Sequence, residues 1–188
     1  TLKVPADWKA IANAPLKIST VLNNRKTYKF LTSDTLSTYL FSFVAGKFEQ
    51  QIGKVGNEKA TFLYRETDTG KIRHSIDKIF KIHDEALMYF EDWTDIPYPF
   101  QKFDFAAIPD FQFGGMEHVG AIQYKAASLF LDGTATRDQI NSRNNLIAHE
   151  TAHMWFADLV TMNWFTDVWM KEVFANFMAD KSAERSVG

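Results

Sequence analysis

The first third of the chain has the hydrophobic patterns of β-strands. Lys26-Thr-Tyr-Lys-Phe30 alternates polar and apolar residues, as a half-buried strand does. The segment 38–46 is more continuously apolar and contains aromatic and β-branched residues, which favours a strand buried on both faces. Residues 59–64 form a third candidate strand, and a turn-rich connector at 53–57 precedes it. These patterns predict a β-rich unit over residues 1–68.

The period of the pattern changes after residue 68. Core-type positions then recur at steps of three and four residues, which indicates an amphipathic helix. These positions are Ile72, Ile76, Ile79, His83, Ala86, Leu87 and Phe90. Asp68 or Thr69 is placed to cap the start of this helix.

The remainder of the chain mixes strands with helices. Strand-like segments at 103–108 and 120–124 flank the glycine pair Gly114-Gly115, and helical patterning dominates from Thr136 onward. We therefore predict an α+β fold, with the β-rich unit 1–68 followed by a mixed unit over residues 69–188.

Composition and charge exclude several classes of protein. Hydrophobic residues make up 46% of the 188 residues and the net charge is -2, so a basic surface for nucleic acid is not expected. The longest uncharged stretch, residues 35–46, is shorter than the roughly 20 residues that cross a bilayer. Because cysteine is absent, any metal ion must be held by His, Asp or Glu. The start at Thr1, without methionine or a signal-peptide pattern, indicates an internal piece of a longer protein and leaves its compartment open.

Two histidines four residues apart give the strongest chemical signal. His149-Glu150-Thr151-Ala152-His153 is an H-E-x-x-H pattern within a helical segment. Positions i and i+4 share one helix face, so both imidazoles can reach one ion. The structural alternative is a pair of surface or helix-capping histidines.

A second helical segment, residues 166–178, favours the metal interpretation. It carries Glu172, with 18 residues between it and His153. A short connection and an antiparallel return would bring Glu172 level with the histidines. We expect His149, His153 and Glu172 to hold one Zn²⁺ per chain, which suits two imidazoles and a carboxylate. Zinc would lower the pKa of its bound water from roughly 16 to about 7. Glu150 would accept the proton of that water and deliver it to the departing amine.

Together with an upstream motif, this pattern resembles the aminopeptidase N and leukotriene hydrolase family of zinc metallopeptidases, the gluzincins. That family carries Gly-x-Met-Glu-Asn, then H-E-x-x-H, then Glu after 18 residues. Here Gly114-Gly-Met-Glu-His118 stands 30 residues before the histidine pattern. Further matches spread the resemblance over most of the chain: 37–40, 46–48, Trp155-Phe156, 159–162, Trp164 and Trp169.

The resemblance implies a fold and a way of binding substrate. It implies the end of a β-rich domain followed by the first part of a thermolysin-like catalytic domain. It also implies that Glu117 binds the free α-amino group of a peptide, which a carboxylate does well. Gly114, Gly115 and Met116 would belong to the substrate-binding segment, where the peptide lies as an added strand. The alternative is a tight turn with Glu117 as a solvated charge.

Five positions depart from the family pattern. His118 replaces the usual Asn, Lys171 and Val173 stand where the family has Asn and Gly, and Met154 and Ala157 replace a common Gln and Gly. The ligands and the base are retained, so the effects expected are on selectivity, metal affinity and local hydrogen bonding.

The sequence thus predicts a zinc-dependent aminopeptidase that acts on peptides with a free N-terminus. The alternatives are an endopeptidase of the same architecture and a zinc-containing peptide-binding module without turnover. The family's transition-state tyrosine lies beyond residue 188, so the chain alone is expected to be nearly inactive.

Other polar residues receive less specific expectations. His74 and His83 lie nine residues apart and do not share a helix face, so we expect surface or boundary positions for both. Asp158 and Asp167 either orient the zinc-binding imidazoles or cap helices.

Overall fold

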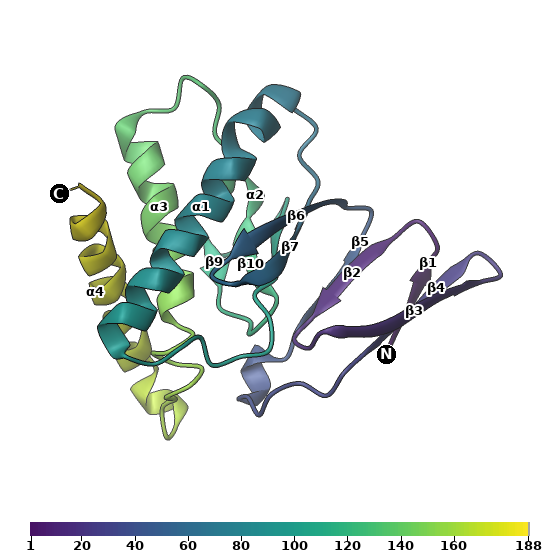
Figure 1. Ribbon diagram of the computed structural model, residues 1–188, viewed down its shortest axis with the longest axis horizontal. Coiled ribbons are helices and arrows are strands. Elements are labelled where there is room, and N and C mark those ends of the chain that lie inside the picture. Colours follow the sequence, from purple (N-terminus) through teal and green to yellow (C-terminus); the bar gives the residue numbers. More distant parts are fainter. Residues whose placement is uncertain (188) are drawn as a thin grey trace.

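The strands of residues 1–187, the part of the chain that the computed structural model describes, form three sheets (Figure 1). A three-stranded sheet has the order β1-β4-β3, and a two-stranded sheet pairs β2 with β5. The third sheet has five strands in the order β6-β7-β8-β10-β9. The strands are β1 Leu2–Pro5, β2 Lys9–Ala12, β3 Leu16–Leu22, β4 Arg25–Phe30, β5 Phe43–Gly46, β6 Glu49–Val55, β7 Glu58–Tyr64, β8 Phe105–Ile108, β9 Gly115–Met116 and β10 Ile122–Lys125.

The helices lie mainly on one side of the five-stranded sheet, where α1, α3 and α4 pack side by side (Figure 1). They are α1 Thr69–Thr94, α2 Ala126–Leu129, α3 Arg137–Ala152 and α4 Val168–Val187, with 3-10 helices at Thr38–Leu40 and Phe165–Asp167. The start of α1 is capped as predicted, because the Asp68 carboxylate accepts hydrogen bonds from the backbone N–H groups of Gly70 and Lys71. This combination confirms the predicted α+β fold.

The central strands β7 and β8 of the five-stranded sheet are buried on both faces. Phe62 and Phe105 point into the large core that the helices cover. The neighbouring positions Leu63 and Ala106 point the other way, into a smaller core that contains Val44 of β5. This alternation follows from the two-residue period of a strand, and it places β7 and β8 in the middle of the molecule.

The segment 38–46 is not the continuous, doubly buried strand that its composition predicts. A 3-10 helix occupies Thr38–Leu40, and only Phe43–Gly46 forms a strand. Phe43 is 50% exposed whereas the next residue, Val44, is buried. The prediction was wrong because β5 pairs only with β2 and packs one of its faces against the sheet.

Strands from both sides of residue 68 share the five-stranded sheet, since β7 pairs in parallel with β8. The division into units 1–68 and 69–188 stays a prediction. Within residues 1–187, no helix is long and apolar enough to cross a membrane.

Candidate metal centre

The histidine pattern lies where helix α3 ends. A capping box of Thr136 and Gln139 starts the helix, and His153 is the residue that caps its C-terminus. The backbone N–H of His153 still donates to the His149 carbonyl, at 3.2 Å, so the last turn keeps its helical geometry. His149 and His153 therefore project from one side of α3.

Helix α4 returns antiparallel beside α3. The Asn145 side chain donates to Asp180 at 3.0 Å, and one turn further along α3 His149 faces Glu172, eight residues earlier in α4. A residue later in α3 thus contacts a residue earlier in α4, as is expected of two antiparallel helices. This register brings Glu172 to the histidines, as the sequence predicts.

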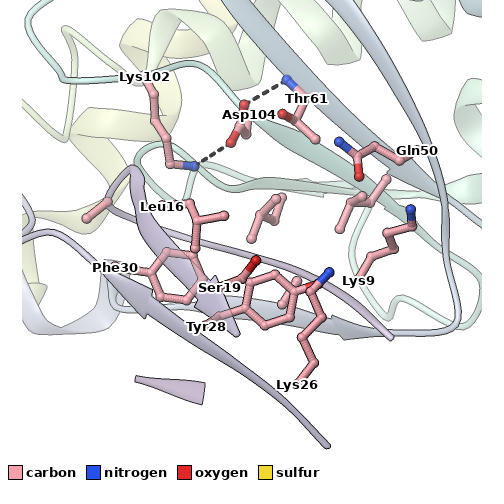
Figure 2. Close-up of a pocket in the computed structure, with 14 residues that line it drawn as sticks. Lys9, Leu16, Ser19, Lys26, Tyr28, Phe30, Gln50, Thr61, Lys102 and Asp104 are labelled. Atoms are coloured by element: carbon pink, nitrogen blue, oxygen red, sulfur yellow. Dashed lines mark hydrogen bonds and ion pairs between the residues drawn. The ribbon is translucent and has the colours of Figure 1, made fainter. Parts of the chain in front are cut away.

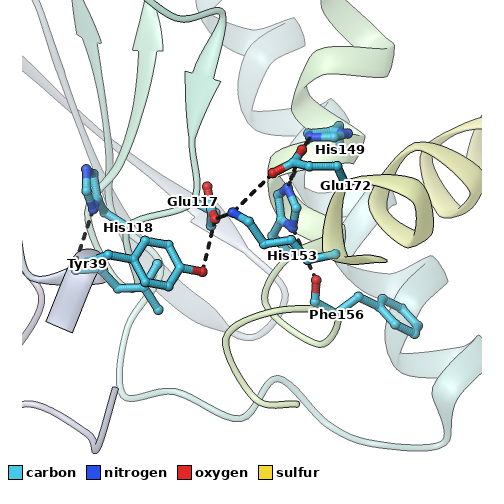
Figure 3. A network of polar contacts seen from close by, with 9 residues as sticks. Tyr39, Glu117, His118, His149, His153, Phe156 and Glu172 are labelled. Atoms are coloured by element: carbon cyan, nitrogen blue, oxygen red, sulfur yellow. Dashed lines mark hydrogen bonds and ion pairs between the residues drawn. The ribbon is translucent and has the colours of Figure 1, made fainter. Parts of the chain in front are cut away.

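The three predicted ligand atoms converge (Figure 3). The two Nε2 atoms of His149 and His153 are 3.0 Å apart. Glu172 Oε2 lies 3.4 Å from His149 Nε2 and 3.6 Å from His153 Nε2. Ligands at about 2.1 Å from a tetrahedral zinc ion are about 3.4 Å from one another. The donor set and its spacing therefore fit one zinc ion.

A main-chain carbonyl orients the buried histidine. His153 Nδ1 lies 3.2 Å from the Phe156 carbonyl oxygen, which fixes the hydrogen on Nδ1 and leaves the lone pair of Nε2 toward Glu172. Asp158 does not take this role, because neither of its carboxylate oxygens has a hydrogen-bond partner within the described residues. The Phe156 carbonyl could not be found from side-chain types.

Glu150 is buried beside the converging histidines. A Cβ atom on Gly115 would lie 2.3 Å from Glu150 Oε1, so only glycine lets this side chain lie against β9. Burial raises the pKa of Glu150, and the negative charges of Glu117 and Glu172 raise it further. A carboxylate in such a place accepts a proton readily.

A second group of carboxylates and imidazole meets beside the first. Ligand atoms of Glu117, Glu150 and His153 all lie within 4.8 Å of one another. All three residues are buried, and Glu117 is already paired with Lys171, so this group lacks the open position of a catalytic zinc site. The group instead shows how close the predicted base and the predicted amine-binding residue lie to His153, a predicted metal ligand.

Glu117 lies directly after β9 with two unexpected partners. Its Oε1 atom accepts a hydrogen bond from the Tyr39 hydroxyl at 3.3 Å and forms an ion pair with Lys171 Nζ. Burial would raise the pKa of Glu117, but the Lys171 ammonium lowers it through its charge and its hydrogen bond. Sequence reasoning missed both partners. Tyr39 belongs to a segment matched by the family resemblance, and Lys171 departs from the family pattern, but neither signal points to Glu117.

His118, the other departure beside Glu117, has a structural partner. Its Nδ1 atom lies 3.1 Å from the Leu40 carbonyl oxygen (Figure 3). Among residues 1–187, His118 belongs to neither group of convergent ligand atoms. This contact holds the residue after Glu117 against the 3-10 helix that carries Tyr39.

β9 is an edge strand of the five-stranded sheet. It pairs with β10 through Gly115 and Met116, and the Gly114 carbonyl accepts a hydrogen bond from Lys125 N at 2.8 Å. A groove of about 580 Å³ adjoins the strand and is lined by Gly114, Gly115, Asn141, Ser142, Asn145, Leu146, His149, Glu150 and Asn176. The predicted substrate-binding glycines and the predicted base thus line one groove.

A separate cavity lies between the three-stranded and five-stranded sheets (Figure 2). It has a volume of about 180 Å³ and includes none of the predicted site residues in its lining. Its charged pair is satisfied internally, because Asp104 accepts from Lys102 Nζ at 2.8 Å and from the Thr61 backbone N–H at 2.7 Å. We assign this cavity a structural origin.

Within the part of the chain that the structure describes, the histidines of α1 belong to neither group of convergent ligand atoms, and the surface or boundary position predicted for His83 was wrong. His83 is fully buried instead of lying at the surface or boundary. Its ring bonds to the Ile79 carbonyl and the Tyr124 hydroxyl, and these contacts make a buried imidazole acceptable. His74 is partly exposed, as expected.

The chain is similar to known proteins over nearly its whole length. Residues 79–188 match the model of the Peptidase family M1 domain. The chain is 35% identical to Aminopeptidase M1-C of Oryza sativa subsp. japonica, over 98% of the chain and 21% of that protein. It is 38% identical to the puromycin-sensitive aminopeptidase of Caenorhabditis elegans, over 95% of the chain and 19% of that protein. Probable aminopeptidase 2 of Sulfurisphaera tokodaii is 34% identical, over 97% of the chain and 23% of that protein. The chain thus spans about a fifth of the length of these relatives.

Proposed function

Because this chain belongs to peptidase family M1, we propose that its site serves the zinc-dependent removal of N-terminal residues from peptides. The observation that carries the proposal is the convergence of His149 Nε2, His153 Nε2 and Glu172 Oε2, with separations of 3.0 to 3.6 Å. Two imidazoles and one carboxylate at this spacing suit zinc and leave a coordination position open. Zinc supplies water of increased acidity and polarises a carbonyl group.

Glu150 acts as the general base in this proposal. Its carboxylate takes a proton from the attacking water and passes it to the amine that leaves. Its raised pKa supports this role, because a base that holds a proton more tightly can keep it between the two transfers.

Glu117 and β9 would hold the peptide. A buried carboxylate gives a charge-assisted hydrogen bond to an N-terminal ammonium and fixes the first residue of the substrate. The edge of β9 offers backbone groups to an extended peptide, beside the groove that also contains Glu150. Removal of one residue follows, because the first peptide bond then lies nearest the base.

Two alternatives make different predictions. An endopeptidase would have no need of the buried carboxylate of Glu117, because its substrate presents no ammonium group there. A binding module without turnover would have no need of Glu150 beside the ligands. Both arguments favour the aminopeptidase.

The test uses the full-length protein that carries this chain. We expect it to release the first residue from peptides with a free amine and not to hydrolyse the same peptides after N-acetylation. We also expect about one zinc per chain. Glu150→Gln is expected to keep zinc and lose activity, by on the order of 100- to 10,000-fold. Glu172→Gln is expected to lose zinc as well, whereas Glu184→Gln on the exposed side of α4 is the matched control that should change neither.

Each alternative has its own outcome in the same assays. Equal cleavage of free and acetylated peptides would favour the endopeptidase. Binding of zinc and peptide without any hydrolysis would favour the binding module. Equal zinc in wild type and Glu172→Gln would remove Glu172 from the ligand set.

A further inference from the structure

A lysine ammonium lies among the carboxylates of the site. Lys171 Nζ forms an ion pair with Glu117 Oε1 and lies 3.1 Å from Glu172 Oε1. Its side chain is only 9% exposed, and Nζ lies 5.0 Å from the centre of the Tyr39 ring. The carboxylate assigned to the substrate amine therefore already has an ammonium partner from the chain itself.

This partner has the same chemistry as the group that Glu117 would bind. A lysine side chain and a peptide N-terminus both present a primary ammonium with three N–H donors. Glu117 Oε1 accepts from Lys171 and also from Tyr39, so its charge is largely compensated before a peptide arrives. The binding free energy that an incoming ammonium gains at Glu117 is therefore only the difference between its own ion pair and the Lys171 ion pair that it replaces.

We propose that Lys171 is a specificity-determining residue whose ammonium competes with the N-terminal ammonium of the substrate for Glu117. The proposal rests on the proposed function, because it takes Glu117 as the amine-binding residue. Lys171 sets how tightly the site binds free amines, and it does so without contacting the reacting bond.

A second carboxylate, that of Glu172, lies beside Lys171 and can pair with it when it releases Glu117. Glu172 divides its two oxygens, with Oε2 toward the histidines and Oε1 toward Lys171. Lys171 can therefore leave Glu117 and keep a carboxylate partner at Glu172. The long lysine side chain allows this exchange without movement of helix α4.

A neutral residue at position 171 removes the competitor and leaves the amine-binding carboxylate. The experiment uses the full-length, zinc-loaded protein in a Glu150→Gln background, so that no probe is hydrolysed. Calorimetry measures the dissociation constants of L-leucinamide, which has a free amine, and of N-acetyl-L-leucinamide. We expect Lys171→Asn to bind L-leucinamide about tenfold more tightly, with N-acetyl-L-leucinamide unchanged. Lys171→Arg retains a competing cation and should therefore show no gain in affinity for L-leucinamide.

Unchanged or weaker binding of L-leucinamide by Lys171→Asn overturns the proposal. Glu117→Gln in the same background separates this failure from failure of the proposed function. If Glu117→Gln weakens L-leucinamide binding while Lys171→Asn has no effect, only the role of Lys171 is wrong. If Glu117→Gln has no effect, Glu117 is not the amine-binding residue and both proposals are wrong.

A second measurement needs no neutral variant, in case Lys171→Asn does not fold. The ¹³Cε resonance of Lys171, assigned by its loss in Lys171→Arg, reports the surroundings of the ammonium. We expect saturation with L-leucinamide to shift this resonance and N-acetyl-L-leucinamide to leave it unchanged. A resonance that stays in place at saturation with L-leucinamide contradicts displacement.

Discussion

Two buried histidines, His83 and His153, show how a core differs from a site. Their exposed fractions are 0% and 1%, and each places Nδ1 near a backbone carbonyl oxygen, at 2.8 Å and 3.2 Å. They differ at Nε2. In His83 this atom accepts from the Tyr124 hydroxyl at 2.9 Å, whereas in His153 it faces another imidazole nitrogen and a carboxylate oxygen.

The two histidines differ in which groups bond to their ring nitrogens. Around His83 the chain satisfies both ring nitrogens and stacks the ring on Phe105, with centroids 4.2 Å apart. Around His153 three electron-pair donors point at one another, an arrangement that a cation stabilises. Burial of a histidine therefore does not by itself predict a metal ligand, whereas convergence of its free nitrogen with other electron-pair donors does predict one.

Substitution of each histidine in turn tests this distinction between core and site, and it should give the largest effect. We expect His153→Ala to lower zinc affinity by more than about 100-fold, the upper range for loss of an outer-shell partner. His83→Gln should retain about one zinc per folded chain, because its ring contacts only core groups. Competition with a chelator of known affinity measures both. Comparable zinc affinity in the two variants would contradict the distinction between core and site.

The next largest effect expected is the loss of folding stability at low pH that His83 causes. Burial lowers the pKa of His83 to about 4, although the hydrogen bond with Ile79 opposes the shift. The unfolded chain binds this proton with a pKa of about 6.5, so between these values the unfolded state holds more protons. Stability from His83 is full above about pH 6.5 and is lost as the pH falls toward 4, by about 3 kcal/mol.

Urea denaturation of wild type and His83→Gln between pH 4 and 7 measures this contribution. The slope of stability against pH should be smaller in His83→Gln. Parallel curves for wild type and His83→Gln would show that His83 does not remain neutral in the fold.

Close packing of the site can be tested at its two glycines. An added Cβ on Gly115 would meet the Glu150 carboxylate at 2.3 Å, but on Gly114 it would meet Leu146 Cδ1 at 3.3 Å. We expect Gly115→Ala to cost about 2 kcal/mol or to displace Glu150, and Gly114→Ala to cost less than about 1 kcal/mol. Denaturation midpoints measure the costs. Equal costs would mean that Glu150 moves freely and that the site is looser than the core.

The smallest expected effect concerns backbone strain next to the carbonyl that orients His153. Ala157 has a φ of 156°, a value that glycine adopts much more readily. We expect Ala157→Gly to stabilise the protein by about 1 kcal/mol, after the larger entropy of glycine in the unfolded chain is subtracted. Thermal unfolding measures the change. Ala175→Gly within helix α4 is the control and should destabilise, and a loss of stability in both variants would exclude strain at Ala157.

The sequence predicted the convergence of His149, His153 and Glu172 better than it predicted the strand at 38–46. The H-E-x-x-H spacing and the later glutamate determine which atoms a helix pair can bring together, because i and i+4 positions share a face and an antiparallel return restores the register. The segment 38–46 was predicted less well. Its apolar composition suits a buried strand, but the number of strands that pair with it depends on residues far away in the chain.

Local spacing thus determined, by itself, the α+β pattern, a helix through positions 72–90 with Asp68 or Thr69 as its cap, the three ligand candidates and the resemblance to the aminopeptidase N and leukotriene hydrolase family. Tertiary structure alone decided that β7 joins β8 across residue 68, that the Phe156 carbonyl rather than Asp158 orients His153, and that Tyr39 and Lys171 meet at Glu117. The physical reason is the separation in sequence between the residues that interact. Helix periodicity and capping act over a few residues, whereas the contacts of Glu117 join positions 78 and 54 residues away, which only the packing of the whole fold brings together.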